Sequence, residues 1–109
     1  MDARIRQVAE NEVRFRALNE RLRALAGTWE GGEGELNLVC ECGDEDCTTP
    51  IALDVREYEA VRAVETQFVV TLGHERGEAE DIVGRGDNWL VVRKRGEAAA
   101  IAAGADPRA

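Results

Sequence analysis

Three cysteines and the only histidine of the chain constrain its fold more than any other feature. Cys40, Cys42 and Cys47 form a C-x-C-x4-C motif, and His74 follows downstream in a Gly-His-Glu sequence. Thiolates and imidazole are the ligands that Zn²⁺ prefers, and four of them complete the tetrahedral shell of a structural site. We therefore interpret Cys40, Cys42, Cys47 and His74 as the ligands of one metal ion, and we expect zinc as the cofactor.

The spacing of these residues explains how a short chain can bring them together. Cys40 and Cys42 are two residues apart, so that in a β-strand their side chains leave the same face. A glycine and a short acidic loop then return Cys47 to the same place. His74 follows a predicted strand and another glycine, which allows its backbone to approach closely. Two strand ends are thus expected to present ligands to one ion.

Other interpretations of the four residues stay open at this point. They include three unrelated buried cysteines with a surface histidine, an iron–sulfur centre, and a redox-active thiol pair at Cys40 and Cys42. Iron–sulfur motifs usually have C-x2-C spacing, which this motif lacks. Four protein ligands leave no coordination position for a catalytic water, and the H-x-E…P-C-x-x-C order of zinc deaminases is reversed here. We therefore expect no catalytic residues and no enzymatic activity.

Length, charge and cysteine number limit the class of protein. A chain of 109 residues has the size of one domain. A formal net charge of -8 disfavours nucleic acid and anionic membranes as partners. The first residues are charged where a signal peptide needs an apolar region, and three cysteines suit a reducing compartment better than a secreted disulfide framework. We expect a cytoplasmic protein.

Hydrophobic periodicity and turn residues predict an α+β fold. We expect a small antiparallel sheet with a long N-terminal helix, one shorter helix and a zinc knuckle. The N-terminal helix is predicted over residues 2–26, with Asp2 as its N-cap and Gly27 beyond its end. Asp54 and Glu57 form the capping box that starts the shorter helix. The predicted strands cover residues 36–42, 51–53, 67–72, 82–83 and 89–92.

The same patterns suggest a division of the chain into four parts. They are the N-terminal helix at 1–26, a glycine-rich hinge at 27–35, the zinc-binding α+β domain at 36–95, and a C-terminal tail at 96–109. The tail is rich in alanine and is expected to form a short helix that becomes partly disordered.

The N-terminal helix has an imperfect apolar stripe. The stripe contains Ile5, Val8, Phe15 and Leu22, with Leu18 and Leu25 at its edge, and it is interrupted at Glu12 and Asn19. One interpretation is that the helix packs on its own sheet, and another is that it binds a partner. A helix of this length spans about 37 Å, more than short strands can cover. We therefore expect a protein partner or a homodimer through residues 4–25.

Four segments of the chain are similar to a known group of sequences. Residues 15–20, 40–47, 57–62 and 68–75 resemble an uncharacterised family of short bacterial proteins, common in GC-rich genomes, and the resemblance runs from Phe15 to Lys94. It implies a shared fold and a shared Cys/His site, and it implies no activity. The outline of a helix plus a Cys/His site also resembles zinc-binding anti-sigma factors, but their H-x3-C-x2-C motif is not present in this sequence.

The sequence therefore leaves three functions to compare. The first is a non-enzymatic, zinc-stabilised interaction or regulatory module. The second is a thiol-based redox or metal sensor, in which oxidation at Cys40 or Cys42 releases the ion. The third is a small enzyme or ligand-binding domain that uses a cleft not evident from the sequence.

Overall fold

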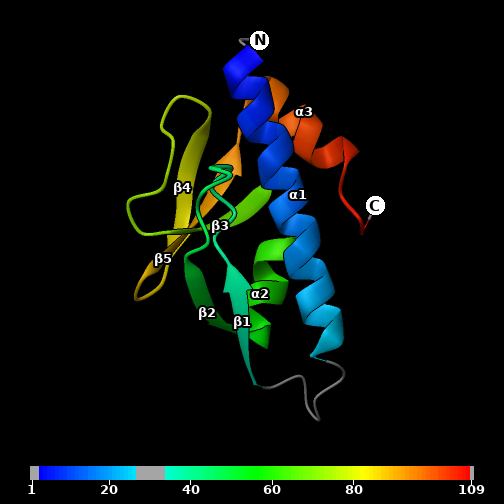
Figure 1. The fold of residues 1–109 in the computed structure, drawn as a ribbon, viewed down its shortest axis with the longest axis vertical. Helices are drawn as coiled ribbons and strands as arrows, with labels where there is room; N and C mark the ends of the chain where they lie inside the picture. The colour runs from blue at the N-terminus through cyan, green and yellow to red at the C-terminus, as the bar shows by residue number, and fades with distance from the viewer. Residues whose placement is uncertain (1–2, 27–33, 109) are drawn as a thin grey trace.

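The computed structural model describes residues 3–26 and 34–108, and in these residues the chain forms three helices and five strands. In order they are α1 (Ala3–Leu25), β1 (Glu35–Val39), β2 (Pro50–Asp54), α2 (Val55–Arg62), β3 (Gln67–Thr71), β4 (Glu80–Arg85), β5 (Trp89–Lys94) and α3 (Gly96–Gly104) (Figure 1). The predicted α+β fold with a long N-terminal helix is confirmed. Asp2, Gly27 and most of the predicted hinge at 27–35 lie outside the described residues.

The strands form two antiparallel sheets, where the sequence analysis expected one. β1 pairs with β2, and β5 lies between β3 and β4. The two sheets meet just after β1. There the Cys40 N–H donates to the Thr49 carbonyl (3.0 Å), and the Glu41 N–H donates to the Val69 carbonyl of β3 (2.9 Å). The strand that was predicted to reach Cys42 therefore ends at Val39.

Helix α2 begins where its capping box predicts. The Asp54 side chain accepts from the Glu57 N–H (2.8 Å), and the Glu57 side chain accepts from the Asp54 N–H (3.0 Å). The helix buries Val55, Tyr58 and Val61, and it packs on β2 and β3. The core around it is mostly aliphatic and contains Leu36, Leu38, Ile51, Leu53, Phe68, Val69, Val70, Leu90 and Val92.

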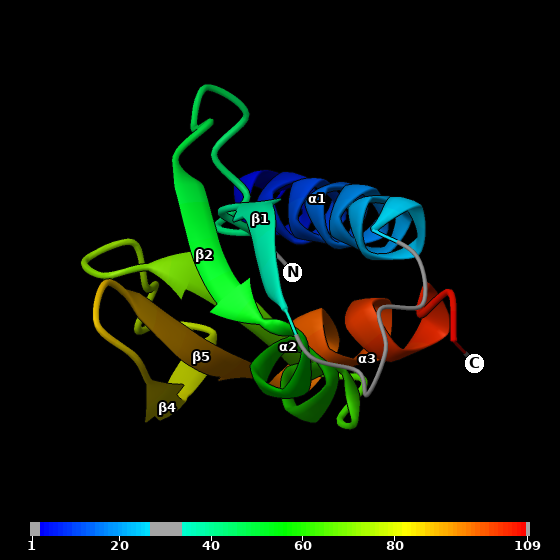
Figure 2. The ribbon, with the colours of Figure 1, turned by 90° about the horizontal axis from the view of Figure 1, so that it is seen from below.

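Helix α1 lies beside β1 and α3, along one flank of the molecule (Figure 2). The face it buries is largely polar and consists of Ala9, Asn11, Glu12, Arg16 and Asn19. The expected apolar stripe is not this face, because Ile5, Val8, Phe15 and Leu22 are only half-buried and Leu18 is exposed. The physical reason is that α1 docks against backbone carbonyls and charged side chains of the rest of the domain, which polar residues match.

Arg16 is the centre of this docking. Its side chain is fully buried, and its two terminal nitrogens donate to the carbonyls of Glu65 (2.6 Å) and Ala102 (2.7 Å). Its guanidinium also lies 4.6 Å from the centre of the Phe68 ring. One arginine of α1 thus joins the segment before β3 to helix α3.

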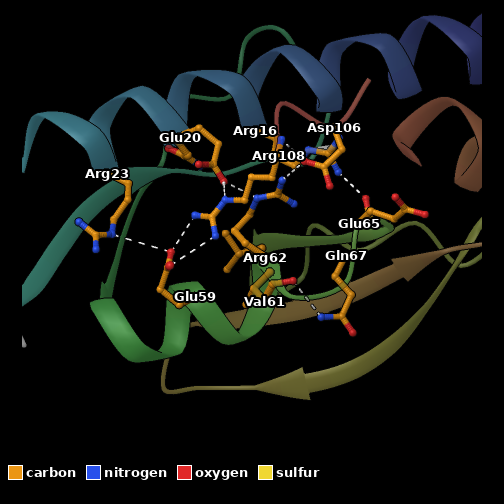
Figure 3. A network of polar contacts seen from close by, with 12 residues as sticks. Arg16, Glu20, Arg23, Glu59, Val61, Arg62, Glu65, Gln67, Asp106 and Arg108 are labelled. Carbon is orange, nitrogen blue, oxygen red and sulfur yellow. Dashed lines mark hydrogen bonds and ion pairs between the residues drawn. The ribbon is translucent and has the colours of Figure 1, made fainter. Parts of the chain in front are cut away.

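A network of ion pairs joins α1, α2 and the residues after α3 (Figure 3). Arg62 of α2 pairs with Glu20 of α1 and with Asp106. Arg108 pairs with Glu20 (2.9 Å) and with Glu59 of α2 (2.7 Å). The residues that follow α3 are therefore held against both other helices.

Lys94, the only lysine of the chain, is buried and forms ion pairs with two acidic residues. Its ammonium lies 2.6 Å from Glu12 of α1 and 3.0 Å from Glu80 of β4. Burial raises the pKa of Glu12 to about 7, although the attraction of Lys94 opposes the shift. A pair of this kind orients α1 more than it stabilises the fold, because desolvation offsets most of the attraction.

We expect Arg16→Met to destabilise the protein strongly, because it leaves the buried carbonyl of Ala102 and the partly buried carbonyl of Glu65 without their donors. At about 1–3 kcal/mol for each unsatisfied group, the free energy of unfolding should fall by about 3 kcal/mol and Tm by at least about 10 °C. Arg21→Met is the matched control, since Arg21 is an exposed arginine of the same helix. Thermal unfolding followed by circular dichroism compares the two. Equal Tm values would contradict the role given to Arg16.

Candidate metal centre

The four predicted ligands come together in space. The sulfur atoms of Cys40, Cys42 and Cys47 and a ring nitrogen of His74 all lie within 4.8 Å of one another. His74 Nδ1 is 3.6 Å from the sulfur of Cys40 and 3.6 Å from that of Cys47. Tetrahedral zinc with Zn–S of about 2.3 Å and Zn–N of about 2.05 Å places sulfur and nitrogen ligands about 3.6 Å apart. The spacing is that of ligands around one ion.

Two turns place the last two ligands. After Gly43, the Asp46 N–H donates to the Asp44 side chain (2.9 Å), and the Cys47 N–H donates to the Asp44 carbonyl (3.0 Å). After β3, the His74 N–H donates to the Thr71 carbonyl (2.9 Å) across Gly73, whose φ of 90° favours glycine. Both turns bring the chain back towards Cys40.

The environment of Cys40 favours the thiolate, which is the form that binds metal. Hydrogen bonds from the Cys42 thiol and from the Thr71 N–H (3.1 Å) lower the pKa of Cys40 well below its usual value. The same hydrogen bond to Cys40 raises the pKa of Cys42. One sulfur of the pair is therefore ready as an anionic ligand, and the second must release its proton when a metal binds.

Glu41, between the two buried cysteines, was not identified from the sequence as part of the site. Its carboxylate is fully buried and accepts from the Val69 N–H (2.9 Å) and from the Asn19 side chain (2.7 Å). Burial raises its pKa to about 7. Since the Glu41 backbone also donates to Val69, this residue fastens the ligand segment to the edge of β3. The signal available in the sequence was the position of this acidic residue between two predicted metal ligands.

Three more side chains that the sequence analysis missed hold the same segment. Asn19 bonds both backbone groups of Val39, at 2.9 Å and 2.8 Å, as a neighbouring strand would. The Asn11 side chain donates to the Gly43 carbonyl (3.0 Å) and the Arg76 side chain to the Cys42 carbonyl (3.1 Å). The ligand loop is thus supported by α1 on one side and by the segment after β3 on the other (Figure 1). Such supporting contacts orient metal ligands.

The ligands differ in exposure. Cys40 and Cys42 are buried, whereas Cys47 and His74 are half-buried. A hollow of about 270 Å³ opens beside His74, and its walls are Cys42, Asp44, Gly73, His74, Glu75 and Arg76. The cluster therefore has one side that faces solvent.

No helix of the described residues combines the length and the apolar character that crossing a bilayer requires.

Gly43 is expected to tolerate no side chain. Its φ is 84°, and a Cβ there would lie 2.7 Å from both the Cγ1 and the carbonyl oxygen of Val8. Gly43→Ala should lower the free energy of unfolding by about 2–4 kcal/mol, since backbone strain and displacement of α1 add. Gly73→Ala is the matched control, because its φ is also positive but its Cβ would meet nothing within 4 Å. A smaller loss for Gly43→Ala than for Gly73→Ala in thermal unfolding would refute the contact with α1.

Comparison of the chain with protein-family models, with curated proteins and with solved structures finds no match. The resemblance to a bacterial family is therefore still an expectation, and the conclusions about this chain come from its own geometry. That geometry brings three cysteines and one histidine together as in a metal site.

Proposed function

We propose that the chain binds one Zn²⁺ through Cys40, Cys42, Cys47 and His74 and serves as a non-enzymatic, zinc-stabilised interaction or regulatory module of the bacterial cytoplasm. The observation that carries the metal assignment is the convergence of four ligand atoms within 4.8 Å. Three sulfurs and one imidazole match structural zinc sites. Iron–sulfur centres use four cysteines, or two histidines and two cysteines, and fit this set less well.

The position of the cluster supports a structural role. Its ligands come from the segment between β1 and β2 and from the segment after β3, so an ion would join the two sheets. Four protein ligands also fill a tetrahedral shell, which leaves no position for a substrate or a catalytic water. Both points favour a module over an enzyme.

Exposed apolar side chains support a protein as the partner. Ile82 and Val83 on the outer strand β4 are 44% and 42% exposed, and Leu18 and Leu25 on α1 are also exposed. The negative net charge adds to the argument against nucleic acid. We retain a homodimer through residues 4–25 as the alternative, with Leu18 and Leu25 available for it.

The metal assignment predicts about one zinc per chain in protein purified without chelator. Cys40→Ala, Cys42→Ala or Cys47→Ala should remove it, because each deletes one of the three anionic thiolates that bind the ion most strongly. Structural zinc in small domains contributes on the order of 10 kcal/mol of apparent binding free energy, so loss of the ion should also lower Tm sharply. Elemental analysis and thermal unfolding measure both effects. Thr48→Ser, an exposed neighbour of Cys47, is the control. Metal-free wild-type protein that is fully folded would contradict the assignment.

A thiol-based sensor is the second candidate, and the half-buried position of Cys47 favours it. An oxidant can reach an exposed sulfur, whereas buried sulfurs bound to metal react slowly. The two functions therefore differ in how fast peroxide releases the ion.

Treatment of the zinc-loaded protein with sub-millimolar hydrogen peroxide separates module from sensor. A structural site should retain zinc for hours, as measured with a zinc-sensitive dye, and release within minutes would favour the sensor. The protein incubated with dye alone controls for spontaneous loss. Recovery of the site after addition of a thiol reductant would show that any release came from reversible cysteine oxidation.

A further inference from the structure

The metal cluster is not equally enclosed on all sides. Cys40 and Cys42 are 0% and 3% exposed, while Cys47 and His74 are half-buried, and of these two His74 is the one that borders the hollow of about 270 Å³. A ligand that leaves the cluster, or an ion that approaches it, meets the least protein on the His74 side.

His74 is also the ligand with the weakest support. The sulfur of Cys40 accepts the Thr71 N–H, and the carbonyl of Cys42 accepts from Arg76. For His74, the ring nitrogen that faces away from the cluster, Nε2, finds no acceptor in the part of the chain that the structure describes. Histidine ligands usually donate this N–H to a carboxylate or carbonyl, which fixes the ring. The flanking residues Gly73 and Glu75 are exposed, so the ring is held mainly by its own turn.

The rim of the hollow is negatively charged. Asp44 and Glu75 are exposed and line it, and the third charged residue there, Arg76, donates to the Cys42 carbonyl. The Asp44 side chain accepts only a backbone N–H, from Asp46, so its charge is not paired with a cation there. A rim of this kind attracts a hydrated divalent cation and repels an anionic chelator.

We propose that this hollow is the path by which a hydrated divalent cation reaches and leaves the cluster, and that His74 is the ligand that dissociates first. In the exchange, the bond between Nδ1 and the ion breaks and a water oxygen takes the fourth position. The three bonds between the ion and the sulfurs then break as the ion leaves, the sulfurs keep their positions in the chain, and no electron is transferred. The inference rests on the metal site proposed above.

The test uses the protein loaded with Co²⁺, whose bonds to thiolates absorb visible and near-ultraviolet light. Loss of this absorption is followed after mixing either with excess Zn²⁺ or with an anionic aminocarboxylate chelator. The double variant Asp44→Asn/Glu75→Gln removes the rim charge and keeps the oxygen that accepts from Asp46. The matched control is Glu35→Gln/Glu65→Gln, which removes two exposed charges, at the first residue of β1 and just before β3, at the ends of these strands far from the ligands.

At low ionic strength the rim variant should exchange with Zn²⁺ about 3–10 times more slowly than wild type, and it should lose Co²⁺ to the anionic chelator faster. Both differences should disappear in about 0.5 M salt, where exposed charges are screened. Opposite changes with the two reagents exclude general destabilisation, which would accelerate both reactions. The control variant should behave as wild type. Equal rates of Co²⁺ loss in the rim variant and the control would overturn the proposal that the hollow is the exchange path.

A second variant tests whether His74 is the ligand that dissociates first. His74→Ala should keep the cobalt–thiolate absorption and release the ion at least about tenfold faster to either reagent. Retention of the wild-type release rate would overturn the role of His74 while leaving the metal site intact. A wild-type protein with no cobalt–thiolate absorption at all would instead refute the metal site itself, so that the two failures are distinguished.

Discussion

The buried carboxylate of Glu41 is the contact on which the rest of this structure depends. It stands between Cys40 and Cys42 of the candidate metal centre and binds the edge of β3, while Asn19 of α1 holds it from the other side. One side chain therefore joins the first sheet, the second sheet and the long helix at the place where the ligands converge. Burial of an acidic group is costly unless its oxygens are hydrogen-bonded, and here both oxygens accept.

The long helix α1 is also positioned by buried polar contacts. α1 docks through Asn11, Glu12, Arg16 and Asn19, each of which meets a partner distant in sequence. Such contacts add little net stability, because removing charged and polar groups from water offsets most of what they contribute. They do specify one position of the helix, since a shift by one residue would leave several groups unpaired. The small aliphatic core supplies the stability, and the polar contacts determine the arrangement.

The candidate metal centre combines a rigid side and an open side. Two cysteines are buried and supported by backbone and side-chain donors, whereas His74 borders the open hollow. A site of this form suits an ion that stabilises the fold and is still exchangeable. Both the proposed zinc-stabilised module and the alternative sensor fit this arrangement, because the two differ in how easily the ion leaves through the open side.

Much of this protein was evident in its sequence. The convergence of Cys40, Cys42, Cys47 and His74, the capping box at Asp54 and the two strands that form β4 and β5 were all predicted, because each is defined by residue types at short spacing or by a rare residue type. Only the tertiary structure decided the division into two sheets, the role of Glu41 and the polar face of α1. Hydrophobic periodicity identifies where apolar side chains recur, but a buried polar residue is determined by its partner. Those partners are remote, as Arg16 and Ala102 illustrate, and only the folded chain brings them together.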